Sequence, residues 1–335
     1  GRVCRRRSEV PFVGTSRFDD VRCRMHILAS LLDGCLDSGR AKFAVISRQS
    51  ENNKMNPLYI ARNFLRRACY KKACRLVSRS GVVRRANLEW RKAPHSEYWA
   101  HAGGGRFHLY GNSQESFDDA IKRGFSVLEA DVSMTADNIP VMSHRFRPNN
   151  EVEFDAIPTV AEFLSRKING QYTPMTLDDF ISRYSKTGLY VALDPSPALR
   201  KQFGADYVLN YVKRTANEKF SRHVIYQLSG VQDLVRFIDI DWVGAFHYNL
   251  DFDLSEDANI WRIDALIPAL RSLGIGSVSY VDMPVTAALE SAVSRFSASD
   301  ILVSVASVNS EARFRRLQEI GVSCIDTDYL YPRKP

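Results

Sequence analysis

The sequence predicts an α/β fold, namely a (β/α)8 TIM barrel preceded by a basic, partly helical N-terminal segment. Two observations carry this prediction. Beyond residue 95, short apolar or β-branched runs alternate with longer stretches of helical spacing, and such alternation is typical of parallel strand pairing. Residues 96–335 hold eight of these units, which is the size and strand count of a (β/α)8 barrel. With 335 residues and 45% hydrophobic content, the chain can bury such a core.

Eight apolar runs are the candidate strands. They are residues 97–102, 126–132, 188–194, 223–228, 241–247, 277–281, 301–308 and 322–327. An additional run at 139–144 follows the second strand too closely for a parallel crossover, which needs about a dozen residues, so we expect it to return as a hairpin or bulge. Helical spacing indicates helices between the strands, at residues 113–123, 176–185, 202–214, 263–273 and 311–320.

Charge divides the chain into two parts. Residues 1–95 hold 22 Lys and Arg against 7 Asp and Glu, a net charge of +15. Residues 96–335 hold 24 against 31, a net charge of −7. We therefore expect a basic, partly disordered segment at residues 1–95 and a barrel domain at residues 96–335, which face different partners.

A basic amphipathic helix is predicted near residues 58–79. Its apolar positions at helical spacing are Ala61, Phe64, Leu65, Ala68, Cys69 and Leu76, with Lys and Arg between them. Three uses stay open: packing on the barrel with a solvated outer face, attachment to an anionic membrane surface, and nucleic-acid binding. No aromatic side chains are interleaved at stacking intervals, so nucleic acid is the least favoured partner.

Cysteine usage and hydropathy predict a cytoplasmic protein that could be peripheral at a membrane. Five cysteines lie in the basic segment and one beyond it: Cys4, Cys23, Cys35, Cys69, Cys74 and Cys324. This spacing indicates neither a disulfide framework nor a metal knuckle, so we expect reduced thiols. No stretch reaches the roughly 18 apolar residues of a membrane span, and the short apolar run at residue 25 does not resemble a secretory signal.

Acidic side chains gather where the predicted strands end, which is where a (β/α)8 barrel builds its site. Glu129 and Asp131 are two apart in a strand, so their side chains share one face. Asp194 ends the third strand. Three carboxylates are a hard oxygen set that suits one divalent cation, Mg²⁺ or Ca²⁺. The alternative is that Glu129 and Asp131 hold Arg or Lys partners at the barrel rim.

Two histidines end strands beside this acidic set, His101 and His144. One imidazole can take a proton from an attacking oxygen while the other gives a proton to the leaving oxygen. The remaining histidines, His26, His95, His108, His223 and His247, are expected to pack or cap. The glycines at 103–105 would let a phosphate or a metal shell approach the backbone, unless they form a simple flexible turn.

A family resemblance is carried by five stretches: "HAGG", "YGNSQESFDDAIKRGFSVLEADVSMTADNIPVMSH", "YTPMTLDDF", "YVALD" and "SVASVNSEARFRRLQEIGVSCIDTDYL". They resemble the glycerophosphodiester phosphodiesterase family within the phosphatidylinositol phospholipase C-like superfamily. The resemblance covers about residues 99–330, and its most specific part is the ordered series His, Glu-x-Asp, His. The closing "GV" and "TD" of the family match Gly321, Val322, Thr327 and Asp328.

The resemblance implies an enzyme that hydrolyses glycerophosphodiesters or related phospholipid-derived diesters. It assigns the catalytic acid and base to His101 and His144, and it assigns a divalent ion to Glu129, Asp131 and Asp194. It also implies that a neighbouring hydroxyl of the substrate is the nucleophile and that the reaction passes through a cyclic phosphate.

Two positions depart from the family pattern. Arg145 stands where the family often has Asp after the second histidine, and Ser196 stands where a lysine commonly steadies the phosphate. Loss of that cation would cost about 3 kcal/mol of transition-state stabilisation unless Arg145, Arg147 or Lys201 replaces it. Two alternatives therefore stay open: a sphingomyelinase D-like phospholipase, which shares the barrel, the histidines and the ion, and a catalytically weakened lipid- or phosphoinositide-binding module.

Overall fold

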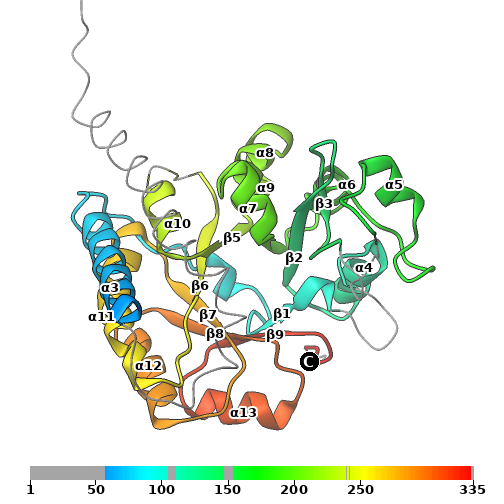
Figure 1. The fold of residues 1–335 in the computed structure, drawn as a ribbon. Helices are drawn as coiled ribbons and strands as arrows, with labels where there is room; N and C mark the ends of the chain where they lie inside the picture. The colour runs from blue at the N-terminus through cyan, green and yellow to red at the C-terminus, as the bar shows by residue number, and fades with distance from the viewer. Residues whose placement is uncertain (1–56, 105–110, 147–153, 239, 241, 333–335) are drawn as a thin grey trace, which may run out of the picture. The chain divides into compact units, whose positions relative to one another are not determined.

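The computed structural model describes residues 57–104, 111–146, 154–238, 240 and 242–332 (Figure 1). The described residues belong to one compact unit, Met55–Pro335. Residues 1–56, where disorder was predicted, lie outside them, as do three of the six cysteines. Cys74 and Cys324 are free thiols, as expected. None of the described helices combines the length and hydropathy needed to cross a bilayer.

Eight parallel strands close into the predicted barrel. They are β1 (Tyr98–Ala100), β2 (Val127–Met134), β4 (Tyr190–Pro195), β5 (Val224–Ser229), β6 (Ala245–Asn249), β7 (Ser277–Val281), β8 (Leu302–Ala306) and β9 (Cys324–Thr327). Each strand pairs with the next, and β1 pairs with both β9 and β2, which closes the ring. All eight predicted strands form, and the (β/α)8 class is confirmed.

The additional run forms β3 (Pro140–Met142), which pairs antiparallel with β2 and confirms the predicted hairpin. Val132 faces Met142 across this pair. The Ser143 backbone N–H then donates to the Asp131 carbonyl over 3.1 Å. The hairpin thus returns the chain to the carboxyl end of β2, where His144 follows at once.

Helices surround the barrel. They are α4 (Gln114–Lys122), α5 (Val160–Ser165), α6 (Leu177–Tyr184), α7 (Pro197–Phe203), α8 (Tyr207–Thr215), α9 (Glu218–Ser221), α10 (Val231–Arg236), α11 (Ile260–Leu273), α12 (Ala287–Ser297) and α13 (Glu311–Glu319), with short 3₁₀ turns η1 (Glu89–Lys92), η2 (His101–Gly103) and η3 (Asp257–Asn259). The predicted helices at 113–123, 176–185, 263–273 and 311–320 correspond to α4, α6, α11 and α13. The helix predicted at 202–214 forms as α8 but starts later than predicted, at Tyr207, because α7 ends at Phe203 and Gly204, with a φ of 91°, separates the two helices.

The basic helix forms as α3 (Pro57–Ser78) and packs on α11 and α10 (Figure 1). Its buried side chains follow i, i+3, i+4, i+7 spacing and are Tyr70, Ala73, Cys74 and Val77. The predicted apolar stripe is wrong at Leu65, which is 61% exposed, and at Ala68, which is exposed as well, whereas Cys69 and Leu76 are half-buried. The side chains of Ala61 and Phe64 lie outside the described part of the chain. The apolar face of α3 serves the core of this unit, so the structure does not support membrane attachment through the helix.

The barrel interior changes from apolar to polar along the strands. An apolar cluster fills its amino end and consists of Trp90, Trp99, Val127, Ala192, Ile225, Ala245 and Cys324. Trp90 of η1 closes this end, with its ring edge-on to Trp99 at 5.1 Å. Because side chains two residues apart share a strand face, the next inward positions lie nearer the carboxyl ends of the strands, where the polar residues stand.

Candidate active site

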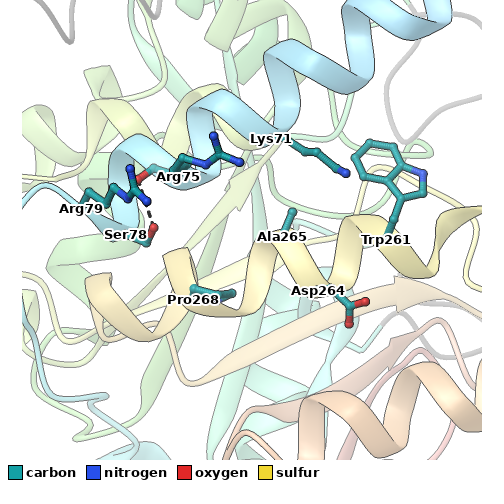
Figure 2. A pocket seen from close by; sticks show the side chains of 8 residues that line it. All are labelled: Lys71, Arg75, Ser78, Arg79, Trp261, Asp264, Ala265 and Pro268. Atoms are coloured by element: carbon teal, nitrogen blue, oxygen red, sulfur yellow. Dashed lines mark hydrogen bonds between the residues drawn. The ribbon is translucent and has the colours of Figure 1, made fainter.

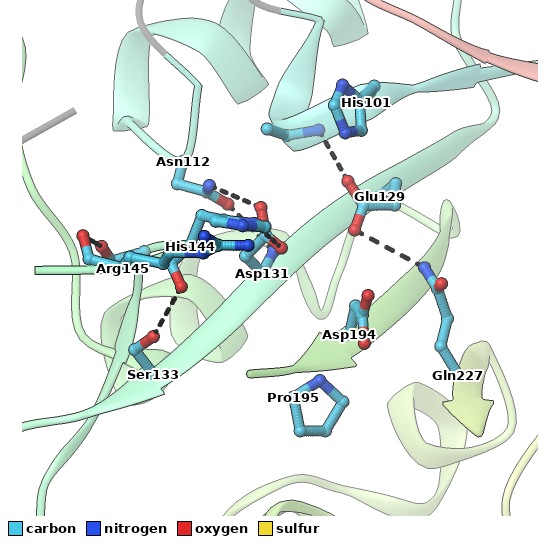
Figure 3. Close-up of polar contacts among 12 residues, drawn as sticks. His101, Asn112, Glu129, Asp131, Ser133, His144, Arg145, Asp194, Pro195 and Gln227 are labelled. Atoms are coloured by element: carbon cyan, nitrogen blue, oxygen red, sulfur yellow. Dashed lines mark hydrogen bonds and ion pairs between the residues drawn. The ribbon is translucent and has the colours of Figure 1, made fainter. Parts of the chain in front are cut away.

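Three carboxylates converge at the carboxyl ends of β2 and β4. Glu129 and Asp131 lie two and four residues after the buried Val127 on the inward face of β2, and Asp194 follows the buried Ala192 on β4. One oxygen from each of the three carboxylates lies within 4.8 Å of the others. Figure 3 shows the cluster with His101 on the Glu129 side and His144 on the Asp131 side.

The cluster fits a divalent cation on chemical grounds. Burial, followed by the negative charge of Asp131, raises the pKa of Glu129 well above its usual range. Burial also raises the pKa of Asp194. Like charges held this close repel unless a cation lies between them. The oxygens lie within 4.8 Å of one another, and two oxygens that share one ion can lie up to about 4.2 Å apart on Mg²⁺ and about 5 Å apart on Ca²⁺.

His144 is bound to the carboxylate cluster through its Nδ1 atom, which lies 3.0 Å from Asp131 Oδ1. Asn112 fixes the same carboxylate, since its Nδ2 donates to Asp131 Oδ2 over 3.0 Å and its Oδ1 accepts from the Asp131 backbone N–H. Burial raises the pKa of Asp131, but the hydrogen bond to His144 and the charge of His144 hold this pKa below its ordinary value. Both oxygens of Asp131 are thereby oriented by side chains.

His101 has its own carboxylate partner, because its Nδ1 lies 2.7 Å from Asp328 Oδ1. The Ser307 hydroxyl lies 3.2 Å from the same nitrogen. Burial alone lowers the pKa of His101, but the hydrogen bond to Asp328 and the charges of Glu129, Asp328 and Asp326 raise it to about 10. The site therefore favours the imidazolium form of His101 and orients its ring by Nδ1.

The turn after β1 connects His101 to the acidic cluster. Ala102 adopts a left-handed φ of 48°, a conformation that costs energy for a residue with a Cβ and is held by its surroundings. In this conformation its backbone N–H donates to Glu129 Oε2 over 2.7 Å. The other oxygen, Glu129 Oε1, lies 3.5 Å from Gln227 Nε2. The strained turn thus binds one oxygen of a carboxylate in the cluster.

Gly103 is required for packing against α4. Its φ is 84°, and a Cβ at this position would lie 2.5 Å from Ser116 Oγ and 2.9 Å from a ring carbon of Phe117. Close approach of helix α4 therefore explains this glycine, where the sequence suggested access for a phosphate or a metal shell. Gly105 lies outside the described residues.

Arg200 is a member of the site that the sequence interpretation missed. Its Nη2 donates to Asp194 Oδ1 over 3.0 Å, and its Nη1 donates to the buried Asp233 over 2.7 Å. Two carbonyls, of Pro195 and Gln227, accept its remaining hydrogen bonds at 2.7 and 2.6 Å. Arg200 thus places a cation against Asp194 and uses its donors within the protein.

Ser196 explains how Arg200 reaches this position. Its hydroxyl accepts from the Leu199 backbone N–H and caps α7, with Pro197 in the first turn. A helix that starts directly after β4 brings Arg200 back over the strand end one turn later. Arg145 and Lys201, two of the cations suggested as substitutes for the family lysine, are exposed, and Arg147 lies outside the described residues.

Asp326 adds a fourth carboxylate on the inward face. It lies two residues after Cys324 of the apolar cluster and is 5% exposed. Its Oδ1 has no hydrogen-bond partner within the part of the chain that the structure describes. Burial raises the pKa of Asp326 to about 7, with the charges of Asp194 and Asp328 acting in the same direction. The strand pattern contained this residue, but no motif singled it out.

The family model described as the glycerophosphoryl diester phosphodiesterase family matches residues 101–331. The matched segment begins at His101 and runs beyond β9, so it includes every predicted site residue. No curated protein matches the chain.

Solved structures of similar fold include several phosphodiesterases. An Oleispira antarctica phosphodiesterase in complex with the product sn-glycerol-3-phosphate is 20% identical, with a TM-score of 0.56 over 72% of this chain and 95% of that chain. A glycerophosphodiester phosphodiesterase from Parabacteroides distasonis is 20% identical, with a TM-score of 0.53 over 69% and 92%. A third, from Thermotoga maritima, is 19% identical, with a TM-score of 0.51 over 69% and 94%. At these sequence identities, the similarity shows that the chains share a fold.

Proposed function

Because the chain belongs to the glycerophosphoryl diester phosphodiesterase family, we propose that it hydrolyses glycerophosphodiesters or related phospholipid-derived diesters. The observation that carries the proposal is the convergence of three carboxylates with His101 and His144 at the carboxyl ends of the barrel strands. The same end of the fold holds the catalytic residues of other enzymes with this architecture.

Glu129, Asp131 and Asp194 would hold one divalent cation, Mg²⁺ or Ca²⁺. When bound, this cation supplies positive charge that neutralises a phosphodiester anion. Neighbouring groups orient the carboxylates for ion binding, since Ala102 and Gln227 contact Glu129 and Asn112 contacts Asp131.

The two histidines divide the proton transfers. The Nδ1 atom of each ring lies against a carboxylate, and we assign proton exchange with the substrate to the Nε2 atom of each ring. His144 takes the proton of the substrate hydroxyl next to the phosphate as its oxygen bonds to phosphorus. His101, whose pKa is raised to about 10, donates a proton to the departing alkoxide oxygen, which releases an alcohol and leaves a cyclic phosphate. Water then opens the cyclic phosphate with the two roles reversed.

Asp328 supports this assignment of the acid. Its carboxylate bonds to His101 Nδ1 and stabilises the protonated ring, and Asn309 Nδ2 holds the second oxygen of Asp328 at 2.8 Å. Burial alone would raise the pKa of Asp328, but the hydrogen bond to His101 lowers it, so Asp328 stays ionised.

Arg200 favours the enzyme over the alternative of a binding module. The discriminating feature is a basic side chain at the acidic cluster, and Arg200 bonds to Asp194. It compensates part of the charge that the family lysine would contribute. The cytoplasmic location and the division at residue 95 stay predictions.

The decisive experiment measures release of alcohol from a panel of phosphodiesters with Mg²⁺, with Ca²⁺ and with a chelator. We expect turnover of glycerophosphodiesters that depends on a divalent ion. Lysophospholipid cleavage without glycerophosphodiester turnover would support the sphingomyelinase D-like alternative. Binding of the same diesters without release of alcohol under any of these conditions would support the binding module.

A further inference from the structure

Helix α3 carries a line of cations on its exposed side. They recur at four-residue spacing and are Arg67, Lys71 and Arg75, followed by Arg79 directly after the last residue of the helix. Successive members of the line lie about 6 Å apart along the axis, because an α-helix rises about 1.5 Å per residue. Like charges at this spacing destabilise a helix. The line therefore opposes the stability of α3 unless anions accompany it.

Three of these cations line a groove between α3 and α11. The groove has a volume of about 440 Å³ and is lined by Lys71, Arg75, Ser78, Arg79, Trp261, Asp264, Ala265 and Pro268. Figure 2 shows Lys71 beside Trp261 and both arginines farther along α3. This volume is within the usual range of small-molecule sites. The groove lies between two helices outside the strands, separate from the carboxylate cluster.

Several exposed arginines elsewhere on the barrel have acidic partners. Arg183 lies 2.6 Å from Asp118, and Arg222 lies 2.7 Å from Glu218. Asp264, the acidic residue in the groove lining, forms an ion pair with Arg295, whose Nη1 lies 2.6 Å from Asp264 Oδ1. Neighbouring carboxylates thus compensate these three arginines, although other exposed arginines, such as Arg214 and Arg271, have no ion pair within the described residues.

The groove cations lack such compensation. Within the described residues, Lys71, Arg75 and Arg79 have no carboxylate within ion-pair distance. Lys71 instead lies over the Trp261 ring at 5.5 Å, with Arg67 over the same ring at 4.6 Å. A row of cations above an apolar floor is electrostatically incomplete, and an anion completes it.

We propose that this groove binds a small polyanion that carries at least two linked phosphate groups. A single phosphate can reach one or two cations of a line that spans about 12 Å, whereas linked phosphates can engage all three. Guanidinium groups bind phosphate oxygens in a bidentate manner, and the ammonium group of Lys71 adds a point charge. The Ser78 hydroxyl supplies a further polar group at the groove wall. This site is independent of the proposed hydrolysis.

The test is calorimetric titration of the full chain with inorganic triphosphate and, separately, with orthophosphate, both in chelator. Chelator removes divalent ions from the carboxylate cluster, which then repels anions. We expect one triphosphate per chain, bound at least tenfold more tightly than orthophosphate. The triple variant Lys71→Gln, Arg75→Gln, Arg79→Gln should lose this binding. The matched control Lys72→Gln, Lys186→Gln, Lys219→Gln removes three exposed cations outside the groove and should retain it.

Single substitutions protect the test against a folding defect. Arg75→Gln alone should weaken triphosphate binding roughly tenfold, as expected for one lost charge-assisted contact, while Lys72→Gln alone should not. Equal losses in the groove and control variants would show general charge attraction and overturn the proposal. Binding of anionic phosphatidylserine vesicles through the groove cations, without triphosphate binding, would overturn it in favour of a membrane surface. Hydrolysis is not a readout, so this result is independent of the proposed function.

Discussion

Arg200 Nη2 lies 3.0 Å from Asp194 Oδ1, so a guanidinium with 11% of its side chain exposed binds one of the three clustered carboxylates. Arg200 also bonds to Asp233, which is 2% exposed. This arrangement leaves one oxygen of Asp194 free of the guanidinium. A single side chain thereby connects the candidate ion site to helix α10, which follows β5.

Removal of the guanidinium should destabilise the fold. Arg200→Met leaves the buried carboxylate of Asp233 without the guanidinium charge, and we expect a loss of about 3–5 kcal/mol in the free energy of unfolding. Arg200→Lys keeps the charge but cannot reach two carboxylates and two carbonyls, so about 1–3 kcal/mol should be lost. Urea denaturation measures both. The exposed pair of Arg222 provides the control, since Arg222→Met should change stability by less than about 1 kcal/mol. Equal effects of the two Met variants would contradict this role of Arg200.

The two histidines should be essential for turnover but not for folding. His101→Ala and His144→Ala each remove one proton-transfer group, and each should lower the hydrolysis rate by roughly 10²–10⁴-fold. Circular dichroism should show that both variants remain folded, because both side chains are partly exposed. His223→Ala, away from the cluster, serves as the control and should keep the rate. A near-normal rate in either site variant would remove that histidine from the mechanism.

Asp131 should contribute to ion binding more than to folding. Asp131→Asn keeps the size of the side chain and removes its charge, so we expect at least tenfold weaker binding of Mn²⁺, measured by calorimetry. The reduced repulsion of Glu129 offsets part of the folding cost. The exposed Asp257→Asn is the control and should bind Mn²⁺ as the parent does. Equal affinity in both variants would place the ion elsewhere.

The strands could be predicted from the sequence because each has an apolar inner or outer face that stands out locally. The triad and the histidine pair could be predicted for the same reason, since they end those strands. Asp326 could have been added by continuing the alternation from Cys324. Arg200 could not, because its contact with Asp194 depends on the start of α7 at Ser196, which periodicity does not define.

The buried face of α3 could not be predicted either, but the reason is different. Both sides of the helix contain apolar residues, and the choice between Leu65 and Tyr70 depends on what α11 and α10 present to the helix. Tyr70 packs edge-on against Trp261 at 5.7 Å, a contact between segments far apart in the sequence. Asn112 illustrates the same limit, since its left-handed φ of 60° and the bond from its backbone N–H to the Ala102 carbonyl accompany its contacts with Asp131, and no local pattern indicates them.

His247 should make stability depend on pH. Burial lowers its pKa from 6.5 to about 3, while Ser277 Oγ and Ser304 Oγ lie 2.8 and 3.4 Å from its ring nitrogens. The unfolded chain therefore takes up a proton near pH 6.5 that the folded chain does not bind. The neutral His247 therefore does not reduce the free energy of unfolding above pH 6.5. As the pH falls from 6.5 toward 3, the free energy of unfolding decreases by up to about 1.4 kcal/mol per pH unit.

Replacement of His247 by glutamine should remove this dependence. Between pH 6 and pH 4, the free energy of unfolding of His247→Gln should fall less steeply than that of the parent, by about 1.4 kcal/mol per pH unit. Urea denaturation at several pH values provides the comparison. His223→Gln, at a partly exposed histidine, should keep the slope of the parent. Parallel curves for the parent and His247→Gln would show that this histidine does not titrate on unfolding.

Two truncations should show which part of the segment before the barrel contributes to the stability of the fold. A chain that lacks residues 1–54 keeps the whole compact unit, so its melting temperature should match the parent. A chain that lacks residues 1–92 loses α3 and η1, including the buried Tyr70, Val77 and Trp90. Burial of a large apolar side chain contributes about 1.5–3 kcal/mol, so the three together are comparable with the roughly 5–15 kcal/mol stability of a domain.

The backbone between α3 and β1 adds to this expectation. The Arg84 N–H donates to the Ser272 carbonyl over 3.0 Å, and the Arg84 side chain donates to the Phe237 carbonyl over 3.2 Å. The shorter chain loses both contacts, so we expect it to melt at a much lower temperature or to be recovered unfolded. Circular dichroism and glycerophosphodiester hydrolysis report the outcome. If residues 93–335 alone melted and turned over substrate like the parent, α3 would be an appendage, and its contacts with α11 would not contribute to the stability of the barrel.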